Sequence, residues 1–253
     1  VKKMKKLVDR LLVIYPFEKS FYDNAGIPVA YVGHPLFDEI HKEGVDEGFV
    51  AELKKQLGGI IVSFLPGSRR QEIVRLLPLF LQSAAQIHQT IPTAQFLISC
   101  SNDQHFDLIR EITKEFNAPY KVVVGNVHEV IKASSLCIAG AGTITLQIAY
   151  YLKPMIIVYK ISPFAYFIAK PFLITPFIGL VNKLAGKMIV PERLMYRANS
   201  AWLVHQAIQL LNNNQKRQAC VHELSLLMDE IAKPGASKHA ADEILTLLGS
   251  KPS

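Results

Sequence analysis

Short apolar runs alternate with helical patterns along the chain as far as Tyr159. Strands that alternate with helices predict an α/β fold with a mainly parallel sheet and helices on both faces. Pro78 either kinks the longest of these helices or starts a second one. The predicted strands are Leu11–Tyr15, Val29–Val32, Ile60–Leu65, Gln95–Ser99, Lys121–Val124, Leu136–Ala139 and Met155–Tyr159, and the predicted helices between them include Arg70–Gln89, Gln104–Phe116, Val127–Ala133 and Thr143–Leu152.

The pattern changes after Tyr159, where Pro163, Pro171 and Pro176 interrupt an apolar and aromatic segment that continues to Val190. This composition predicts no regular βα unit. The tail again shows helical spacing, with a Pro-Gly break before its last helix. The predicted tail helices are approximately Ala198–Asn212, Gln215–Lys233 and Ala236–Leu248.

The turn after the third predicted strand carries groups that bind anions. Gly67 lets the backbone approach a ligand closely, and Ser68 with Gln71 reads as a capping box at a new helix. The N–H groups of that helix start favour negative charge, and Arg69 and Arg70 add forked donors. The alternative is an ordinary strand-to-helix turn with solvated arginines.

A second turn of this kind follows the strand that ends at Ala139. Gly140 and Gly142 allow backbone N–H groups to meet a phosphate, and Thr143 or Thr145 adds a hydroxyl. Gln147, about one helical turn further on, is within reach of a sugar hydroxyl. Strand ends of an open α/β sheet meet at one edge, where ligands bind. The alternative is that the glycines serve only close packing, since a dinucleotide fingerprint needs a third glycine where Thr145 stands.

Composition narrows the classes of function. The chain has 253 residues, 50% hydrophobic, and a mean hydropathy of +0.21, which suits a large core. The net charge of +7 fits nucleic acid, an anionic membrane surface or phosphorylated substrates. No RNA-binding aromatic motif, zinc spacing or long basic run is present, so nucleic acid is not expected. The three cysteines are far apart, which fits a reducing cytosol.

Membrane insertion and targeting are not expected from the sequence. The uncharged run Ala133–Leu152 is long enough to span a bilayer, but its Ser, Gly, Thr and Gln residues favour a strand, a loop and a helix. The basic opening Val1–Arg10 leads into Leu11–Ile14, which is too short for the apolar region of a signal peptide.

Several motifs that follow one another along the chain resemble a known family. They closely resemble the C-terminal portion of the lipid-A-disaccharide synthase family, from about Val1 into the tail. The ordered set is far more specific than any one member. The motifs are Tyr31-Val32-Gly33-His34-Pro35-Leu36, Leu65-Pro66-Gly67-Ser68-Arg69 with Glu72-Ile73, Gly142-Thr143 with Thr145-Leu146, Ile178-Gly179-Leu180 with Asn182 and Leu184-Ala185-Gly186, and Val190-Pro191-Glu192.

The resemblance implies an inverting glycosyltransferase of GT-B architecture, with two Rossmann-like domains across a cleft. Such enzymes join UDP-2,3-diacylglucosamine to 2,3-diacylglucosamine 1-phosphate and release UDP. They use no metal and no cofactor besides the donor, and they work peripherally at the cytoplasmic face of the inner membrane. Residues 1–30 are then the end of the N-terminal domain, 31–190 the Rossmann-like donor-binding domain, and 191–253 helices that pack on the N-terminal domain or on a partner subunit.

The resemblance also assigns site residues. Departing UDP gains negative charge on its β-phosphate, so preorganised N–H groups and a guanidinium stabilise the transition state. Arg69 and Asn182 are the expected catalytic residues, and the general base is expected in the N-terminal domain. His34, before Pro35, is expected to order its loop rather than act as a base. The expected donor-binding residues are Gly67, Ser68, Arg69, Gly142, Thr143, Thr145, Gln147 and Glu192.

The chain departs from the family pattern at several positions. Gln147 stands where the family usually has Glu, and it loses the charge that pairs strongly with ribose hydroxyls. We therefore expect altered donor affinity or specificity. The other departures are Ala141 for Ser, Ser135 for Asp, Val181 for Pro and Met195 for Gln.

Because the general base belongs to the N-terminal domain, residues 1–253 alone are not expected to catalyse; disaccharide synthesis by the purified chain would contradict this. A fragment, a split subunit and a degenerate gene product all remain open. So do two other functions: a non-catalytic module that binds nucleotide-sugar or phosphate, and a peripheral membrane or assembly module whose C-terminal helices form a homo-oligomer. The aromatic segment Ile161–Val190 suits either an acyl-chain surface or a core.

Overall fold

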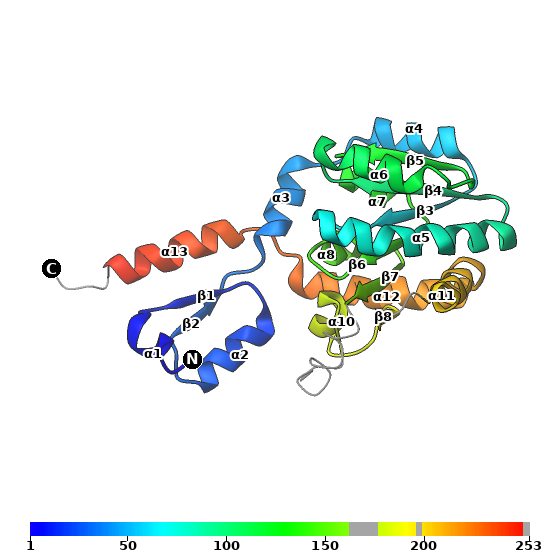
Figure 1. Ribbon diagram of the computed structural model, residues 1–253. Coiled ribbons are helices and arrows are strands. Elements are labelled where there is room, and N and C mark those ends of the chain that lie inside the picture. The colour runs from blue at the N-terminus through cyan, green and yellow to red at the C-terminus, as the bar shows by residue number, and fades with distance from the viewer. Residues whose placement is uncertain (162–176, 196–198, 250–253) are drawn as a thin grey trace. The chain divides into compact units, whose positions relative to one another are not determined.

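The computed structural model describes residues 1–161, 177–195 and 199–249. The chain forms two compact units, one of Val1–Gly44 with Leu226–Ser253 and one of Val45–Ser225 (Figure 1). Within the first unit, helix α3 (Pro35–Glu43) contacts helix α13 (Ala236–Gly249). The domain bounds expected after residues 30 and 190 stay a prediction.

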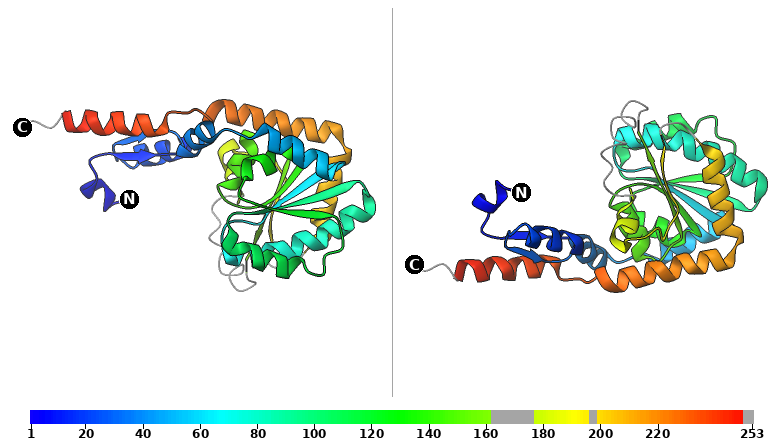
Figure 2. Two further views of the ribbon diagram at one scale, coloured as in Figure 1. Left: turned by 90° about the horizontal axis from the view of Figure 1, so that it is seen from above. Right: turned by 90° about the horizontal axis from the view of Figure 1, so that it is seen from below.

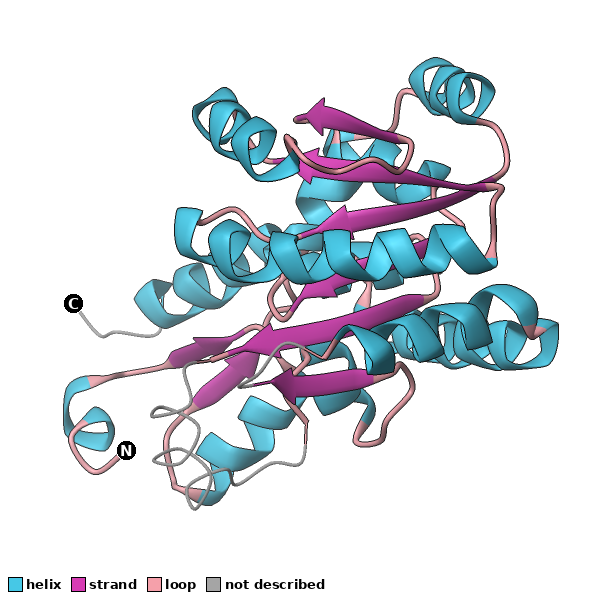
Figure 3. Cartoon of the chain, turned by 45° about the vertical axis from the view of Figure 1, so that its right-hand side comes forward, coloured by secondary structure: helices cyan, strands magenta, loops and turns pink. Residues whose placement is uncertain are grey.

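The second unit is built on a six-stranded sheet in the order β5-β4-β3-β6-β7-β8, and every pairing is parallel (Figure 3). This confirms the predicted α/β fold. Its strands are β3 (Ile60–Leu65), β4 (Ala94–Cys100), β5 (Tyr120–Val124), β6 (Leu136–Gly140), β7 (Met155–Lys160) and β8 (Glu192–Met195).

Helices cover both faces of this sheet, as Figure 2 shows. Burial on both sides explains why the central strands are continuously apolar. Phe64 of β3 is fully buried and stacks on Phe80 and Phe96, with ring centroids 5.4 and 5.5 Å away. The helices of the unit are α4 (Glu47–Leu57), α5 (Arg70–Thr90), α6 (Phe106–Thr113), α7 (Val127–Ala133), α8 (Ile144–Tyr150), α10 (Leu180–Ala185), α11 (Ser200–Asn212) and the larger part of α12 (Asn214–Ile231), with a 3₁₀ turn at Asp103–His105.

The structure tests some local predictions and not others. Helix α5 continues through Pro78, so this proline does not start a second helix. The segment from Tyr159 to Val190 contains α10, and β8, which begins just after it, pairs in parallel with β7. Because residues 162–176 lie outside the described residues, the absence of a regular βα unit there stays a prediction. Most of the aromatic segment that suits either an acyl-chain surface or a core, from Phe164 to Phe172, lies outside the described residues.

The uncharged run Ala133–Leu152 folds as predicted, with β6 and α8 joined by a loop. Among the described helices, none is long and apolar enough to cross a membrane.

The first unit has a small parallel pair of strands, β1 (Leu11–Val13) and β2 (Val29–Tyr31), with helix α2 (Pro16–Asn24) between them in sequence and the short α1 (Met4–Leu7) before them. His34 caps α3, because its Nδ1 accepts a hydrogen bond from the Leu36 N–H at 3.1 Å. This confirms the expected ordering role.

Asp38 of α3 caps a helix that is distant in sequence. Its carboxylate accepts hydrogen bonds from the backbone N–H groups of Gly235 and of Ser237, the latter at 2.9 Å, at the start of α13. These bonds favour the charged carboxylate and hold the pKa of Asp38 below its ordinary value. The cap therefore fastens the end of the chain to α3 within the first unit.

Asp38→Ala is predicted to destabilise α13 by about 1 kcal/mol at neutral pH, the usual cost of a lost N-cap. Because the folded pKa is depressed, the contribution is complete above the unfolded pKa and is lost as the pH falls through the folded pKa. Hydrogen exchange of the α13 amides measures the effect, which should shrink in acid. Glu39→Ala, an exposed carboxylate on the same helix, is the control. Equal α13 exchange rates in the two variants would contradict the prediction.

Candidate functional site

A cavity of about 970 Å³ opens at the carboxyl edge of the large sheet. The strand order reverses between β3 and β6, and the turns after these two strands form its centre. This is the position at which open α/β sheets bind ligands. The predicted site residues that line the cavity are Gly67, Ser68, Arg69, Gly142, Thr143 and Gln147.

The turn after β3 has no room for a side chain at Gly67. This residue has φ +112°, and an added Cβ would overlap the carboxylate of Glu72. Helix α5 begins at Arg70, with Arg69 as its N-cap. The Arg69 N–H donates to Glu72 Oε2 at 3.3 Å, so Arg69 and Glu72 replace the predicted pair Ser68 and Gln71. The correction follows from the extended backbone of Arg69, which delays the helix by one residue.

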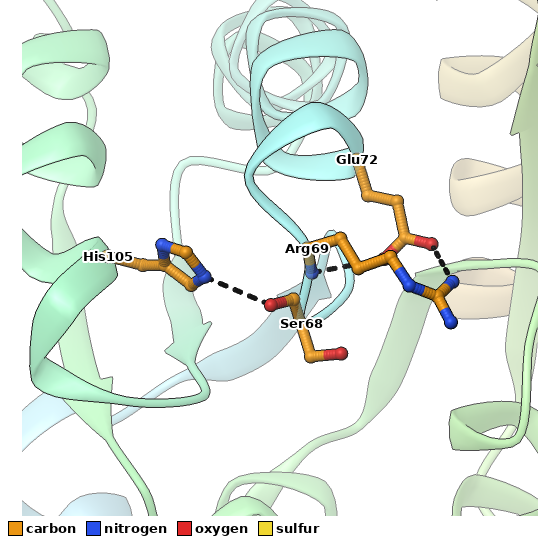
Figure 4. Close-up of polar contacts among 4 residues, drawn as sticks. All are labelled: Ser68, Arg69, Glu72 and His105. Atoms are coloured by element: carbon orange, nitrogen blue, oxygen red, sulfur yellow. Dashed lines mark hydrogen bonds and ion pairs between the residues drawn. The ribbon is translucent and has the colours of Figure 1, made fainter.

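The Arg69 side chain projects from this turn (Figure 4). It is 82% exposed, and its Nη1 lies 3.0 Å from Glu72 Oε1. On the other side of the turn, the Ser68 carbonyl lies 3.0 Å from His105 Nε2. The backbone is thus held from both sides, while most of the five N–H donors of the guanidinium remain available.

Thr145 stabilises the turn after β6 from the protein interior. This residue is fully buried, and its hydroxyl donates to the Gly142 carbonyl at 2.7 Å. Thr145 therefore supports the turn and does not line the cavity. Thr143 is exposed at the cavity, and a Cβ added at Gly142 would meet no atom within 4 Å.

Gln147 lines the same cavity one turn into α8. Its Oε1 is buried and has no hydrogen-bond partner among the described residues. A buried acceptor without a partner is unfavourable unless a ligand or water satisfies it. This atom is therefore available to a hydroxyl or amine donor of a ligand.

Asn182 lies outside the cavity lining and is fully buried. Its Nδ2 donates to the Val190 carbonyl at 2.9 Å and to Glu192 Oε2 at 2.8 Å. Its Oδ1 accepts from the N–H groups of Ile189 and Val190, at 2.8 and 3.0 Å. All four hydrogen-bonding positions of this amide are thus used inside the protein.

Glu192 completes this network. Its carboxylate accepts from the backbone N–H groups of Ile178 and Gly179 at 2.7 and 2.9 Å, directly before α10. Asn182 and Glu192 therefore tie the start of α10 to β8. Both side chains are thus engaged in hydrogen bonds within the protein.

The cavity also contains residues that sequence reasoning missed. Ser101 follows the end of β4, and the Gly125-Asn126 turn, where Asn126 has φ +48°, follows the end of β5. Both could have been found by extending to β4 and β5 the expectation that strand ends meet at one edge of the sheet. Sequence reasoning did not assign Arg75 or Lys160 to this cavity. Lys160 Nζ donates to the Arg75 carbonyl at 3.2 Å.

The charges of the cavity lining favour an anion. Arg69, Arg70, Arg75 and Lys160 line it, whereas Glu72 is the only carboxylate among the lining residues of the described chain. Glu72 is already engaged by Arg69. A ligand with more than one negative charge therefore suits this site.

Comparison with known proteins identifies the family of this chain. The family model for lipid-A-disaccharide synthetase matches residues 1–244. The chain belongs to this family. The synthase of Syntrophus aciditrophicus is 33% identical over 243 residues, and that of Geobacter sulfurreducens is 32% identical over 252 residues. The matches cover 96 and 99% of this chain but only 63 and 65% of those two proteins.

Solved structures of other proteins have a fold similar to that of this chain. UDP-GlcNAc 2-epimerase from Neisseria meningitidis bound to UDP-GlcNAc matches with a TM-score of 0.62 and 12% identity, over 97% of this chain and 63% of that one. HepE of Anabaena in complex with UDP-glucose matches with a TM-score of 0.59 and 11% identity, over 98 and 66%. At these identities the likeness concerns the fold alone.

Proposed function

We propose that this chain is the donor-nucleotide portion of a lipid-A-disaccharide synthase. The cavity takes the UDP group of UDP-2,3-diacylglucosamine, whose sugar is transferred to 2,3-diacylglucosamine 1-phosphate. The observation that carries the proposal is the cationic cavity where the turns after β3 and β6 meet. Family membership and the UDP-sugars bound to the two similar structures support it.

The diphosphate is assigned to the turn after β3. Gly67 and Ser68 bring the backbone close, and Arg69 supplies a guanidinium. Helix α5 adds the N–H groups and the dipole of a helix start. As the bond to the sugar breaks, charge grows on the β-phosphate, so a preorganised Arg69 favours departure of UDP. Arg69 is thus the catalytic residue of this portion.

The ribose is assigned to Gln147, whose buried Oε1 accepts a hydrogen bond from a ribose hydroxyl. Gly142 and Thr143 contact the nucleotide beside it. Asn182 and Glu192 act as positioning residues through α10 and β8, and Thr145 acts through the Gly142 turn. The catalytic role first expected of Asn182 is thereby replaced in the proposal by an indirect one.

The remaining parts of the reaction are assigned elsewhere. The chain spans 63 and 65% of the two relatives, so the acceptor site and the general base are assigned to a portion that corresponds to the rest of their length. Action at the cytoplasmic face of the inner membrane, and association through the C-terminal helices, belong to the same proposal. The cavity alone also suits a non-catalytic module that binds nucleotide-sugar.

UDP is predicted to bind the isolated chain, and Arg69→Ala to weaken binding about 10- to 100-fold, because a hydrogen bond to a charged group contributes about 1.5–3 kcal/mol. Isothermal titration calorimetry measures both affinities. Arg110→Ala is the matched control, since this arginine lies over the Phe106 ring and outside the cavity lining. An unchanged affinity in Arg69→Ala would refute the assignment of the diphosphate.

Gln147→Leu is predicted to weaken UDP binding about three- to tenfold, because the acceptor for the ribose is lost. Binding of pyrophosphate, which has no ribose, should not change. Gln147→Glu restores the family's carboxylate and should strengthen UDP binding instead. If Gln147→Leu weakens UDP and pyrophosphate equally, the residue does not contact the ribose.

Transfer activity separates the synthase from the non-catalytic module. The portion of the Syntrophus aciditrophicus synthase that lies outside its match to this chain is fused before Val1. We expect the fusion to form the disaccharide and Arg69→Ala in it to lower turnover at least about tenfold, as loss of one transition-state donor does. The fused synthase portion alone is the control. A fusion that binds UDP but transfers nothing would favour the non-catalytic module.

A further inference from the structure

A second hollow, of about 690 Å³, lies in the second unit at the opposite edge of the same sheet. It opens where β3, β6 and β7 begin, at the ends away from the arrowheads in Figure 3, and residues of α11 and α12 complete it. The proposed UDP site does not extend to this edge. The lining residues are Lys54, Ile60, Ala133, Ser134, Ser135, Leu152, Lys153, Pro154, Leu211, Arg217, Gln218, Val221 and His222.

The charges around this hollow have one sign. Lys54, Lys153 and Arg217 line it together with His222, and none of the lining residues in the described chain is Asp or Glu. Like charges that share a concave surface repel one another, and a bound anion offsets this repulsion.

Lys153 is held in place by the end of α8. Leu152 has φ +52°, a left-handed conformation that is rare for such a residue. It lets the Lys153 N–H donate to the Ile148 carbonyl at 3.2 Å, and the next residue, Pro154, is buried. The Lys153 Cα, from which the side chain begins, is therefore fixed by the hydrogen bond before it and by the buried proline after it.

The Lys153 ammonium has no ion pair or hydrogen bond with the described residues, although the residue is only partly exposed. Burial and the charges of Lys54 and Lys132 lower its pKa. Lys132 is paired with Glu47, whereas Lys153 has no such partner. The thiol of Cys137 supplies no counter-charge at neutral pH, because burial raises its pKa to about 12.

Ser135 and Arg217 add hydrogen-bond donors to the same hollow. The neighbouring Ser134 does not, since its hydroxyl donates to the Val130 carbonyl at 2.6 Å. Ser135 is exposed, and its N–H bond to the Ile61 carbonyl, 2.8 Å, fixes it at the sheet edge. Arg217 is oriented by the Leu211 carbonyl at 2.9 Å and by Asn214 Oδ1 at 2.8 Å. The hollow thus combines an oriented Arg217, a Lys153 with a fixed backbone and the exposed Lys54 with a hydroxyl donor.

From this geometry we propose that the hollow is a second anion-binding site, which takes the phosphate group of a small phosphorylated ligand between Lys153, Lys54 and Arg217. A phosphate has the multiple charge and the several acceptor oxygens that this set of donors requires. The concave shape favours a compact ligand over a polymer. Ser135 and His222 complete the contacts.

Pyrophosphate is the probe, titrated by calorimetry into the Arg69→Ala chain so that the first cavity contributes little. We expect binding to persist there and to weaken about tenfold when Lys153→Gln is added, as for one lost charge-assisted hydrogen bond. Ser135→Asp adds a carboxylate to the hollow and should weaken binding at least as much. Lys121→Gln, at the start of β5 beside Gln56, is the matched control. Thermal unfolding checks that every variant folds.

The proposal is overturned if Lys153→Gln and Ser135→Asp both bind pyrophosphate as the Arg69→Ala chain does, or if Arg69→Ala alone abolishes binding. If Arg69→Ala changes nothing while Lys153→Gln weakens binding, the second site stands and the diphosphate assignment in the first cavity fails. The two proposals are therefore tested separately.

Chemical modification locates the site and identifies the source of the phosphate. A lysine with a lowered pKa reacts readily with acetic anhydride, and mass spectrometry follows Lys153 against Lys121. Pyrophosphate should protect Lys153 selectively. Vesicles of phosphatidylglycerol, compared with phosphatidylcholine, test a lipid headgroup. Protection by anionic vesicles but not by pyrophosphate would overturn the proposal of a small phosphorylated ligand. Protection by neither would overturn the proposal of an anion-binding site.

Discussion

The parallel pairing of β3 with both β4 and β6 determines where the ligand-binding groups of this chain lie. The register sets Leu65 opposite Ala139, so the two strands end side by side and their turns begin together. Each turn then enters a helix that packs back on the sheet. The connection after β3 leads to β4 on one side, and the connection after β6 leads to β7 on the other. The helices that follow the two strands therefore diverge, and a cavity remains at the strand ends. The chemistry of the cavity follows from which residues occupy these two turns.

Within the turn after β3, one carboxylate orients one of the cations. Glu72 accepts from the Arg69 backbone and pairs with its guanidinium, and the absence of a side chain at Gly67 makes room for it. Glu72 thus fixes the direction of Arg69 without cancelling the excess of positive charge around it. An exposed ion pair contributes little to stability, so its main effect is orientation. A ligand with two or more negative charges can compete for the guanidinium while the backbone cap remains.

The sequence allowed most of the sheet to be predicted but only part of the site. Strands such as Ile60–Leu65 are apolar throughout because both of their faces are buried, and this signal is local. The role of Asn182 depends on contacts with Val190 and Glu192, which no local pattern reveals. A motif marks such a residue without distinguishing a ligand contact from a supporting one. Arg75 and Lys160 were missed for the same reason, since only the fold brings them to the cavity.

The positive charge at the two edges of the sheet has different physical origins. Helices α8 and α11 end at the amino edge, and cations there interact favourably with the carbonyl ends of helices. This accounts for Arg217, which donates to the Leu211 carbonyl near the end of α11. The same dipole acts on Lys153 at the end of α8, but the Lys153 ammonium has no hydrogen bond among the described residues and lies near two further lysines. A desolvated cation among like charges is unfavourable, so an anion that binds there relieves an existing repulsion as well as forming new contacts.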